Sequence, residues 1–165
     1  MIFHKHQYKI GILGAGSFGT ALANTFAEKN LVTLWGNEPE VIKEIKQNNT
    51  NQKYLGEIEL SSKILPTLDI EQAITKADFL IFAVPSSATR EVAIKTKKFI
   101  RRKTIIVSVA KGLEQATGFR MSQILYRGLR KNPVVVLSGP SHAEELGHGI
   151  PTSVVAASNK EKYAR

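Results

Sequence analysis

Short apolar runs alternate with amphipathic or polar segments along this 165-residue chain. Runs of strand type, rich in β-branched residues, lie at 8–13, 31–35, 64–66, 79–84, 104–109, 134–137 and 152–157. Segments with helical spacing or helix-capping residues lie between them, at 20–29, from 37 onward, and at 69–74, 88–100, 121–129 and 142–146, and a capping box at Ser158–Glu161 predicts a further helix after the last strand. The alternation predicts an α/β fold with a doubly wound, mostly parallel sheet over residues 1–165.

The first predicted turn from strand to helix contains Gly14, Gly16 and Gly19 in the order Gly-Ala-Gly-Ser-Phe-Gly. A strand, this glycine pattern and a helix in succession are typical of the Rossmann dinucleotide-binding fold. Gly14 permits the tight turn, Gly16 lets the backbone approach a pyrophosphate, and Gly19 lets the helix pack close to the strand. The free N–H groups at the helix start favour phosphate. The pattern predicts NAD or NADP binding, and a purely structural glycine turn is the alternative.

The ends of two other predicted strands bear on the cofactor. The second strand ends in Trp35-Gly36-Asn37, and the first carboxylate, Glu38, lies beyond it. Many dinucleotide folds place an acidic residue at this strand end to bind the ribose. Because this strand end has none, both NAD and NADP are possible cofactors. The fourth strand ends in Val84-Pro85-Ser86, which either faces the cofactor or simply ends the strand with a proline.

Composition narrows the function classes. There is no cysteine, which excludes disulfides and cysteine-based metal or nucleophile sites. His4, His6 and His148 lack the spacing of a metal site, so no metal is predicted. The N-terminus has no apolar segment of signal-peptide length, and no apolar run is long enough to span a bilayer. We therefore expect a cytoplasmic protein without membrane insertion.

The formal net charge of +9 favours an acidic partner. Basic residues are concentrated in Lys95–Lys103, but with Phe99 as its single aromatic residue the run lacks the interleaved aromatic pattern and any known motif of a nucleic-acid surface. A solvated helix end is the preferred interpretation, with no nucleic acid bound, and a small phosphorylated substrate fits the charge. Residues 47–62 are polar and without periodicity, so Asn48–Asn51 are expected in a surface loop without an assigned role.

Several motifs together resemble one family. They are Gly14–Ala23, Leu34-Trp35-Gly36, Val84-Pro85-Ser86, Lys111-Gly112-Leu113-Glu114 and Ser138–Glu145, and they look like those of bacterial NAD(P)-dependent glycerol-3-phosphate dehydrogenase. The resemblance implies reversible oxidation of sn-glycerol 3-phosphate to dihydroxyacetone phosphate, which supplies glycerophospholipid synthesis. A dehydrogenase for another acid or phosphate fits the last two motifs less well.

The resemblance also implies roles for individual residues. Ser17 and Phe18 would contact the cofactor pyrophosphate, and Ala143 would contact the cofactor. Lys111 would lie beside cofactor and substrate, while Gly139 and Ser141 would hold the substrate. A lysine at a strand end suits a phosphate or a polarised oxygen, although a plain surface lysine is the alternative. Asn37 stands where the family often has a basic residue for the NADP 2′-phosphate, and its neutrality weakens the case for NADP.

The chain is shorter than the family's proteins, which have a second, helical domain with a lysine as general base. No segment here resembles the surroundings of that lysine, and His142 lacks an orienting carboxylate. We therefore expect no catalytic residue in this chain, which would be the cofactor-binding half of an enzyme that lacks its C-terminal helical domain. Homodimerisation of the full-length protein is left open. A stand-alone NAD(P)-binding module or redox sensor is the alternative function.

Overall fold

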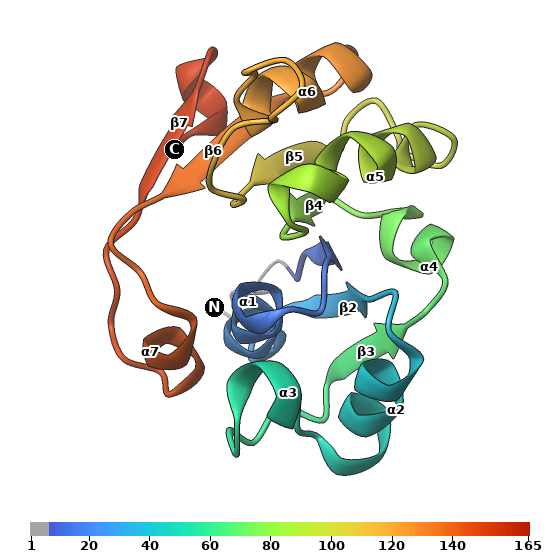
Figure 1. Ribbon diagram of the computed structural model, residues 1–165, viewed down its shortest axis with the longest axis vertical. Coiled ribbons are helices and arrows are strands. Elements are labelled where there is room, and N and C mark those ends of the chain that lie inside the picture. The colour runs from blue at the N-terminus through green and yellow to red at the C-terminus, as the bar shows by residue number, and fades with distance from the viewer. Residues whose placement is uncertain (1–6) are drawn as a thin grey trace, which may run out of the picture.

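The computed structural model describes residues 7–165, which form a seven-stranded sheet in the order β3-β2-β1-β4-β5-β6-β7 (Figure 1). The strands are β1 (Lys9–Leu13), β2 (Leu31–Trp35), β3 (Ile64–Thr67), β4 (Phe79–Phe82), β5 (Ile105–Ser108), β6 (Val134–Ser138) and β7 (Val155–Ser158). The first six strands are parallel, and β7 pairs with β6 in the antiparallel direction. This is the Rossmann order with one added edge strand, so the predicted fold class is confirmed.

Helices cover both faces of the sheet because alternate strand residues point to opposite sides. In β4, Ile81 packs with one buried cluster, whereas Leu80 and Phe82 pack with the other. The helices are α1 (Ser17–Ala27), α2 (Pro39–Asn48), α3 (Gln52–Leu55), α4 (Ile70–Ile74), α5 (Thr89–Thr96), α6 (Met121–Gly128) and α7 (Ala143–Gly147). Residues of α1, α2, α3 and α7 contribute to the first cluster, and residues of α4, α5 and α6 contribute to the second.

Most element boundaries lie within two residues of the sequence prediction, and the larger differences include those at α5, β7 and the segment after β7. Helix α5 ends at Thr96, and residues 97–100 form a turn instead of continuing the helix to residue 100. The last strand begins at Val155 rather than at 152, and its apolar side chains are exposed at the sheet edge. The helix expected from Ser158 is only a 3₁₀ turn, Glu161–Tyr163. Ser158 ends β7 and its hydroxyl donates to the Val134 carbonyl at 2.8 Å, so it does not cap a helix.

Residues 47–62 are more ordered and more buried than their polar composition suggests. Helix α2 extends to Asn48, and Asn49 ends it in the left-handed conformation with φ of 54°. Helix α3 follows, and Leu55 and Leu60 are buried in the core. The prediction of a surface loop over Asn48–Asn51 is therefore wrong at both ends, because Asn48 belongs to α2 and Asn51 is fully buried.

Within residues 7–165, no helix is long and apolar enough to cross a membrane. The same part of the chain contains no group of three or more histidine, aspartate or glutamate side chains that could hold a metal ion. His4 and His6 lie outside the described residues.

Candidate functional site

The glycine-rich loop leaves the carboxyl end of β1 and is held between its two neighbouring strands. The Gly14 N–H donates to the Trp35 carbonyl at 2.8 Å, and the Ala83 N–H donates to the Leu13 carbonyl at 2.8 Å. Gly14 has φ of +119°, and a Cβ there would lie 2.6 Å from the Ala83 carbonyl oxygen. The turn therefore requires glycine at this position for both conformation and space.

The other two glycines of the motif have different structural requirements. A Cβ on Gly19 would lie 1.9 Å from the Gly14 carbonyl oxygen, so the helix can pack on the loop only without a side chain there. Gly16 has an ordinary φ of −75°, and a Cβ there would meet nothing within 4 Å. Folding does not require glycine at position 16, and its open side lies at the start of α1, where a bound anion would approach the backbone.

A buried asparagine from the segment expected at the surface supports this loop. The Asn51 amide donates to the Ala15 carbonyl at 3.0 Å and to the Thr20 hydroxyl at 2.8 Å. The Thr20 hydroxyl in turn donates to the Ala15 carbonyl at 3.2 Å. Asn51 and Thr20 are fully buried. Their hydrogen bonds fix Ala15 between the first two glycines, which explains why a polar side chain is buried here.

A hollow of about 570 Å³ lies beside the loop, at the carboxyl ends of β1, β2 and β4. This is where the strand order reverses direction, the usual ligand position in an open α/β sheet. The hollow brings together six predicted cofactor residues: Gly14, Gly16, Ser17, Phe18, Asn37 and Lys111. Val84, Pro85 and Ser86 also line it, which agrees with the interpretation that this turn faces a ligand.

A second hollow, of about 340 Å³, continues from the first past Lys111. It shares Ser17, Phe18 and Lys111 with the first and reaches Ser141 and Ala143. Lys111 therefore borders both spaces, as a residue between cofactor and substrate would. Two predicted residues line neither hollow. Gly19 lies behind the loop in α1, and a Cβ on Gly139 would lie 2.5 Å from the Ser153 carbonyl oxygen, so close packing accounts for that glycine.

A charged cluster lies at the far end of the first hollow. Glu38, just after β2, accepts hydrogen bonds from the Lys53 ammonium and the Tyr54 hydroxyl. These bonds, that from Lys53 above all, hold the pKa of the Glu38 carboxyl below its usual value. Glu38 and Tyr54 line the hollow. A carboxylate and an ammonium are thus present together where the second strand ends.

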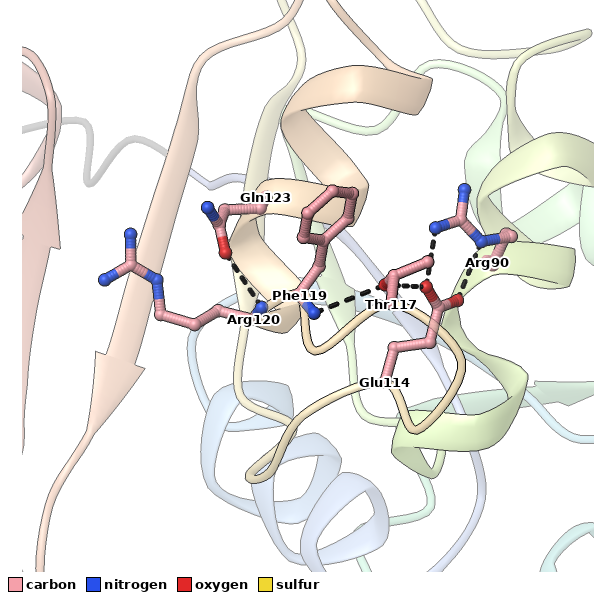
Figure 2. Close-up of polar contacts among 6 residues, drawn as sticks. All are labelled: Arg90, Glu114, Thr117, Phe119, Arg120 and Gln123. Carbon is pink, nitrogen blue, oxygen red and sulfur yellow. Dashed lines mark hydrogen bonds and ion pairs between the residues drawn. The ribbon is translucent and has the colours of Figure 1, made fainter.

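The loop that contains Lys111 is attached to α5 by an ion pair (Figure 2). Arg90, in the first turn of α5, donates through Nε and Nη2 to the two carboxylate oxygens of Glu114, each at 2.7 Å. The Thr117 hydroxyl also donates to Glu114. The bidentate geometry fixes both the distance and the orientation of the loop. These bonds, led by that from Arg90, lower the pKa of Glu114 to about 2.

Further bonds close the same loop on itself. The Glu114 N–H donates to the Phe119 carbonyl at 2.9 Å, and the Gly118 N–H donates to the Glu114 carbonyl at 2.8 Å. At its far end the Arg120 N–H donates to the Gln123 side chain at 2.9 Å, which caps α6 (Figure 2). Lys111 thus belongs to a loop whose next residues are held from α5 on one side and from α6 on the other.

We expect Glu114 to make stability dependent on pH in the acid range. Its pKa of about 2 in the folded protein lies below the ordinary value of 4.5, so its stabilisation is complete above about pH 4.5 and disappears as the pH falls toward 2. Glu114→Gln should lower the midpoint of thermal unfolding at pH 7, and the difference from the unchanged protein should vanish near pH 2. Thermal unfolding followed by circular dichroism across this range measures it.

Glu91→Gln is the matched control, because the Glu91–Lys95 pair is an exposed ion pair within one helix and contributes little. A difference between Glu114→Gln and the unchanged protein that stayed constant from pH 7 to pH 2 would contradict the assignment of the ion pair.

The sequence of almost the whole chain is also similar to that of a known family. The family model described as NAD-dependent glycerol-3-phosphate dehydrogenase N-terminus matches residues 9–164. The chain belongs to this family. The predicted resemblance is thereby confirmed.

Several glycerol-3-phosphate dehydrogenases are similar to this chain in sequence or in structure. The chain is 45% identical over 156 residues to glycerol-3-phosphate dehydrogenase [NAD(P)+] of Clostridium acetobutylicum, which covers 94% of the chain and 47% of that protein. The protein of the same name from Moorella thermoacetica is also 45% identical, over 157 residues, with 94% and 46% covered. The crystal structure of the Coxiella burnetii glycerol-3-phosphate dehydrogenase superposes with a TM-score of 0.88 at 33% identity, covering 95% of this chain and 48% of that one.

The chain spans about half the length of the curated relatives it matches. That share agrees with the expectation that the sequence corresponds to the N-terminal, dinucleotide-binding part of such proteins.

Sequence reasoning missed residues that support the site from a distance in the chain. Asn51 carried only the signal of polarity in a segment without periodicity, and Arg90 looked like any helix-surface cation. Tyr54 gave no signal at all. His142, considered as a proton carrier, is exposed at the start of α7, and its imidazole has no hydrogen bond or ion pair with the described residues.

Proposed function

We propose that this chain is the cofactor-binding part of an NAD(P)-dependent glycerol-3-phosphate dehydrogenase. The enzyme would interconvert sn-glycerol 3-phosphate and dihydroxyacetone phosphate and supply glycerophospholipid synthesis. The observation that carries the proposal is the open side of Gly16. A fold that does not need glycine there nevertheless has one, at the N-terminus of α1 and facing a hollow lined by the family's motifs.

The proposed roles follow from position. Backbone N–H groups at the start of α1, with Ser17 and Phe18, would bind the pyrophosphate. NAD or NADP supplies the hydride acceptor when bound. Lys111, which borders both hollows, would hold the negative charge of the substrate near the cofactor, and Ser141 would orient the substrate in the second hollow. Gly139 would act through its backbone. Ala143 would contact the cofactor from the second hollow. Cytoplasmic location and homodimerisation of the full-length protein stay predictions.

Cofactor choice tests the assignment of the first hollow. We expect NADH and NADPH to bind residues 1–165 with affinities within about tenfold, or roughly 1.4 kcal/mol. Asn37 supplies no cation for a 2′-phosphate, and the carboxylate of Glu38 is compensated by Lys53. Titration of the intrinsic nicotinamide fluorescence measures both affinities.

Lys53→Gln is the informative variant. It leaves the Glu38 carboxylate without its cation, so NADPH binding should weaken more than NADH binding. Lys29→Gln, at the opposite end of α1, is the control for general charge. A hundredfold preference for one cofactor in the unchanged protein, or no effect of Lys53→Gln on the ratio, would contradict this arrangement. Failure of both cofactors to bind would contradict the proposed function itself.

A further inference from the structure

A group of cations gathers where the parallel strands begin, at the end of the sheet opposite the glycine loop. Arg102 and Lys103 form the centre of a turn before β5, closed by the Thr104 N–H donating to the Arg101 carbonyl at 3.1 Å. Arg130 and Lys131 form the centre of a similar turn before β6, closed at 3.0 Å between the Asn132 N–H and the Leu129 carbonyl. Because β5 and β6 are parallel neighbours, both turns lie side by side at the amino ends of these strands.

Buried hydrogen bonds fix the two turns against each other. The Asn132 side chain is buried and donates to the Arg101 carbonyl at 2.7 Å and to the Thr104 carbonyl at 2.9 Å. The Thr104 hydroxyl donates to the Ala77 carbonyl at 2.7 Å. One asparagine of the second turn therefore holds both ends of the first turn. Their four cations are presented by a backbone that is already fixed, which lowers the cost of ordering on binding.

The antiparallel edge strand adds a fifth cation. Ser158, at the end of β7, pairs with Val135 near the start of β6, and its hydroxyl donates to the Val134 carbonyl. Lys160, two residues further on, is thereby brought to the amino end of β6, close to the two turns. A parallel strand in this position would have ended at the other end of the sheet, where the strands have their carboxyl ends and the cofactor hollow lies. The added strand β7, visible at the edge of the sheet in Figure 1, thus completes the cluster.

The five cations line one hollow of about 330 Å³ that contains no carboxylate among its lining residues; they are Arg102, Lys103, Arg130, Lys131 and Lys160. None of them forms an ion pair with another of residues 7–165. Other basic residues of the chain behave differently, since Arg90 pairs with Glu114 and Arg101 with Asp78. Like charges gathered without partners repel one another and disfavour the compact state, so folding gives no reason for the cluster.

We propose that this hollow is a binding site for a small anion with several phosphate groups. Its volume is that of a small-molecule site, and its cations converge from three segments into one concave space. A nucleic-acid surface would instead extend its cations along a groove. Asn159 and the exposed Tyr126 add hydrogen-bonding groups at the rim. The site is separate from the cofactor hollow and is independent of the proposed dehydrogenase function.

Calorimetric titration of residues 1–165 with inorganic tripolyphosphate tests the proposal. We expect saturable binding that weakens at least tenfold in the double variant Arg130→Gln/Lys131→Gln. The matched control Lys43→Gln/Lys46→Gln removes the same charge from the exposed face of α2, beside β3 at the far side of the sheet, and should change the affinity less than twofold. Without ligand, Arg130→Gln/Lys131→Gln should unfold at a temperature equal to or above that of the unchanged protein, because it relieves repulsion.

Two further arms identify the site and the source of the phosphates. Gly16→Leu should bind tripolyphosphate normally, whereas loss of binding in that variant would place the anion at the glycine loop and overturn the proposal. Equal weakening by both double variants would also overturn it, as would binding of a DNA duplex or phosphatidylserine vesicles without binding of tripolyphosphate. ATP that binds more tightly than tripolyphosphate would support a nucleotide as the ligand, and the reverse order would support free polyphosphate. Neither result depends on whether NADH binds.

Discussion

Replacing Gly16 by leucine is expected to abolish NADH and NADPH binding while leaving the fold in place. A side chain at this position meets nothing within 4 Å in the protein, and the backbone φ of −75° is ordinary for leucine. Gly16 precedes the first residue of α1, so leucine there costs about 1 kcal/mol at most through weaker helix capping. The same side chain would fill the space through which a pyrophosphate approaches the N–H groups of the helix. We expect the affinity to fall by more than about a hundredfold, or roughly 2.7 kcal/mol.

Nicotinamide fluorescence titration measures the loss, and thermal unfolding shows that the variant is folded. Gly19→Ala provides the contrast, because its Cβ would lie 1.9 Å from the Gly14 carbonyl oxygen and α1 would have to move. We therefore expect Gly19→Ala to lower the stability of the fold itself, rather than to block the cofactor directly. Undiminished cofactor binding by folded Gly16→Leu would show that the glycine loop does not bind the pyrophosphate.

The sequence predicted those parts of the fold that depend on local pattern. Each buried strand, such as Phe79–Phe82, is a short apolar run, and each crossover contains a helical segment, so the parallel order followed from connectivity. The glycine motif placed the site at the end of β1 because two of its requirements are local: Gly14 has a positive φ, and a Cβ on Gly19 would meet the Gly14 carbonyl oxygen. The hollow beside this loop contains six of the residues that the motifs indicated, among them Lys111.

Contacts between distant segments could not be predicted in this way. Asn51 is separated by 36 residues from Ala15, whose carbonyl it binds, and Arg90 by 24 residues from Glu114. A polar residue reads as exposed unless its partner is known, which is why Asn48–Asn51 were expected in a surface loop. The basic run Lys95–Lys103 illustrates the same limit, since its members separate in the structure. Lys95 and Arg101 have carboxylate partners, whereas Arg102 and Lys103 turn into the five-cation hollow.

Residues 1–165 alone are expected not to oxidise NADH in the presence of dihydroxyacetone phosphate. Hydride transfer to a carbonyl carbon needs a group that gives the oxygen its proton, and such a group contributes about 10²–10⁴-fold. Lys111 and His142 are the candidates beside the second hollow, and both are exposed. His142 has no orienting partner in the described part of the chain. The sequence resemblance implies that this group is a lysine of a second, helical domain, and we expect that domain also to close over the substrate and exclude water.

The measurement is the loss of nicotinamide absorbance with dihydroxyacetone phosphate, on residues 1–165 alone and with the C-terminal half of the Clostridium acetobutylicum relative added as a separate chain. Turnover that appears only in the mixture, and that disappears again with Gly16→Leu, would support a base outside this chain acting on a cofactor held within it. Clear turnover by residues 1–165 alone would contradict the expectation and would assign the proton to Lys111 or His142. Lys111→Ala and His142→Ala would then distinguish these two, because only the variant that lacks the proton donor would lose the rate while NADH still bound.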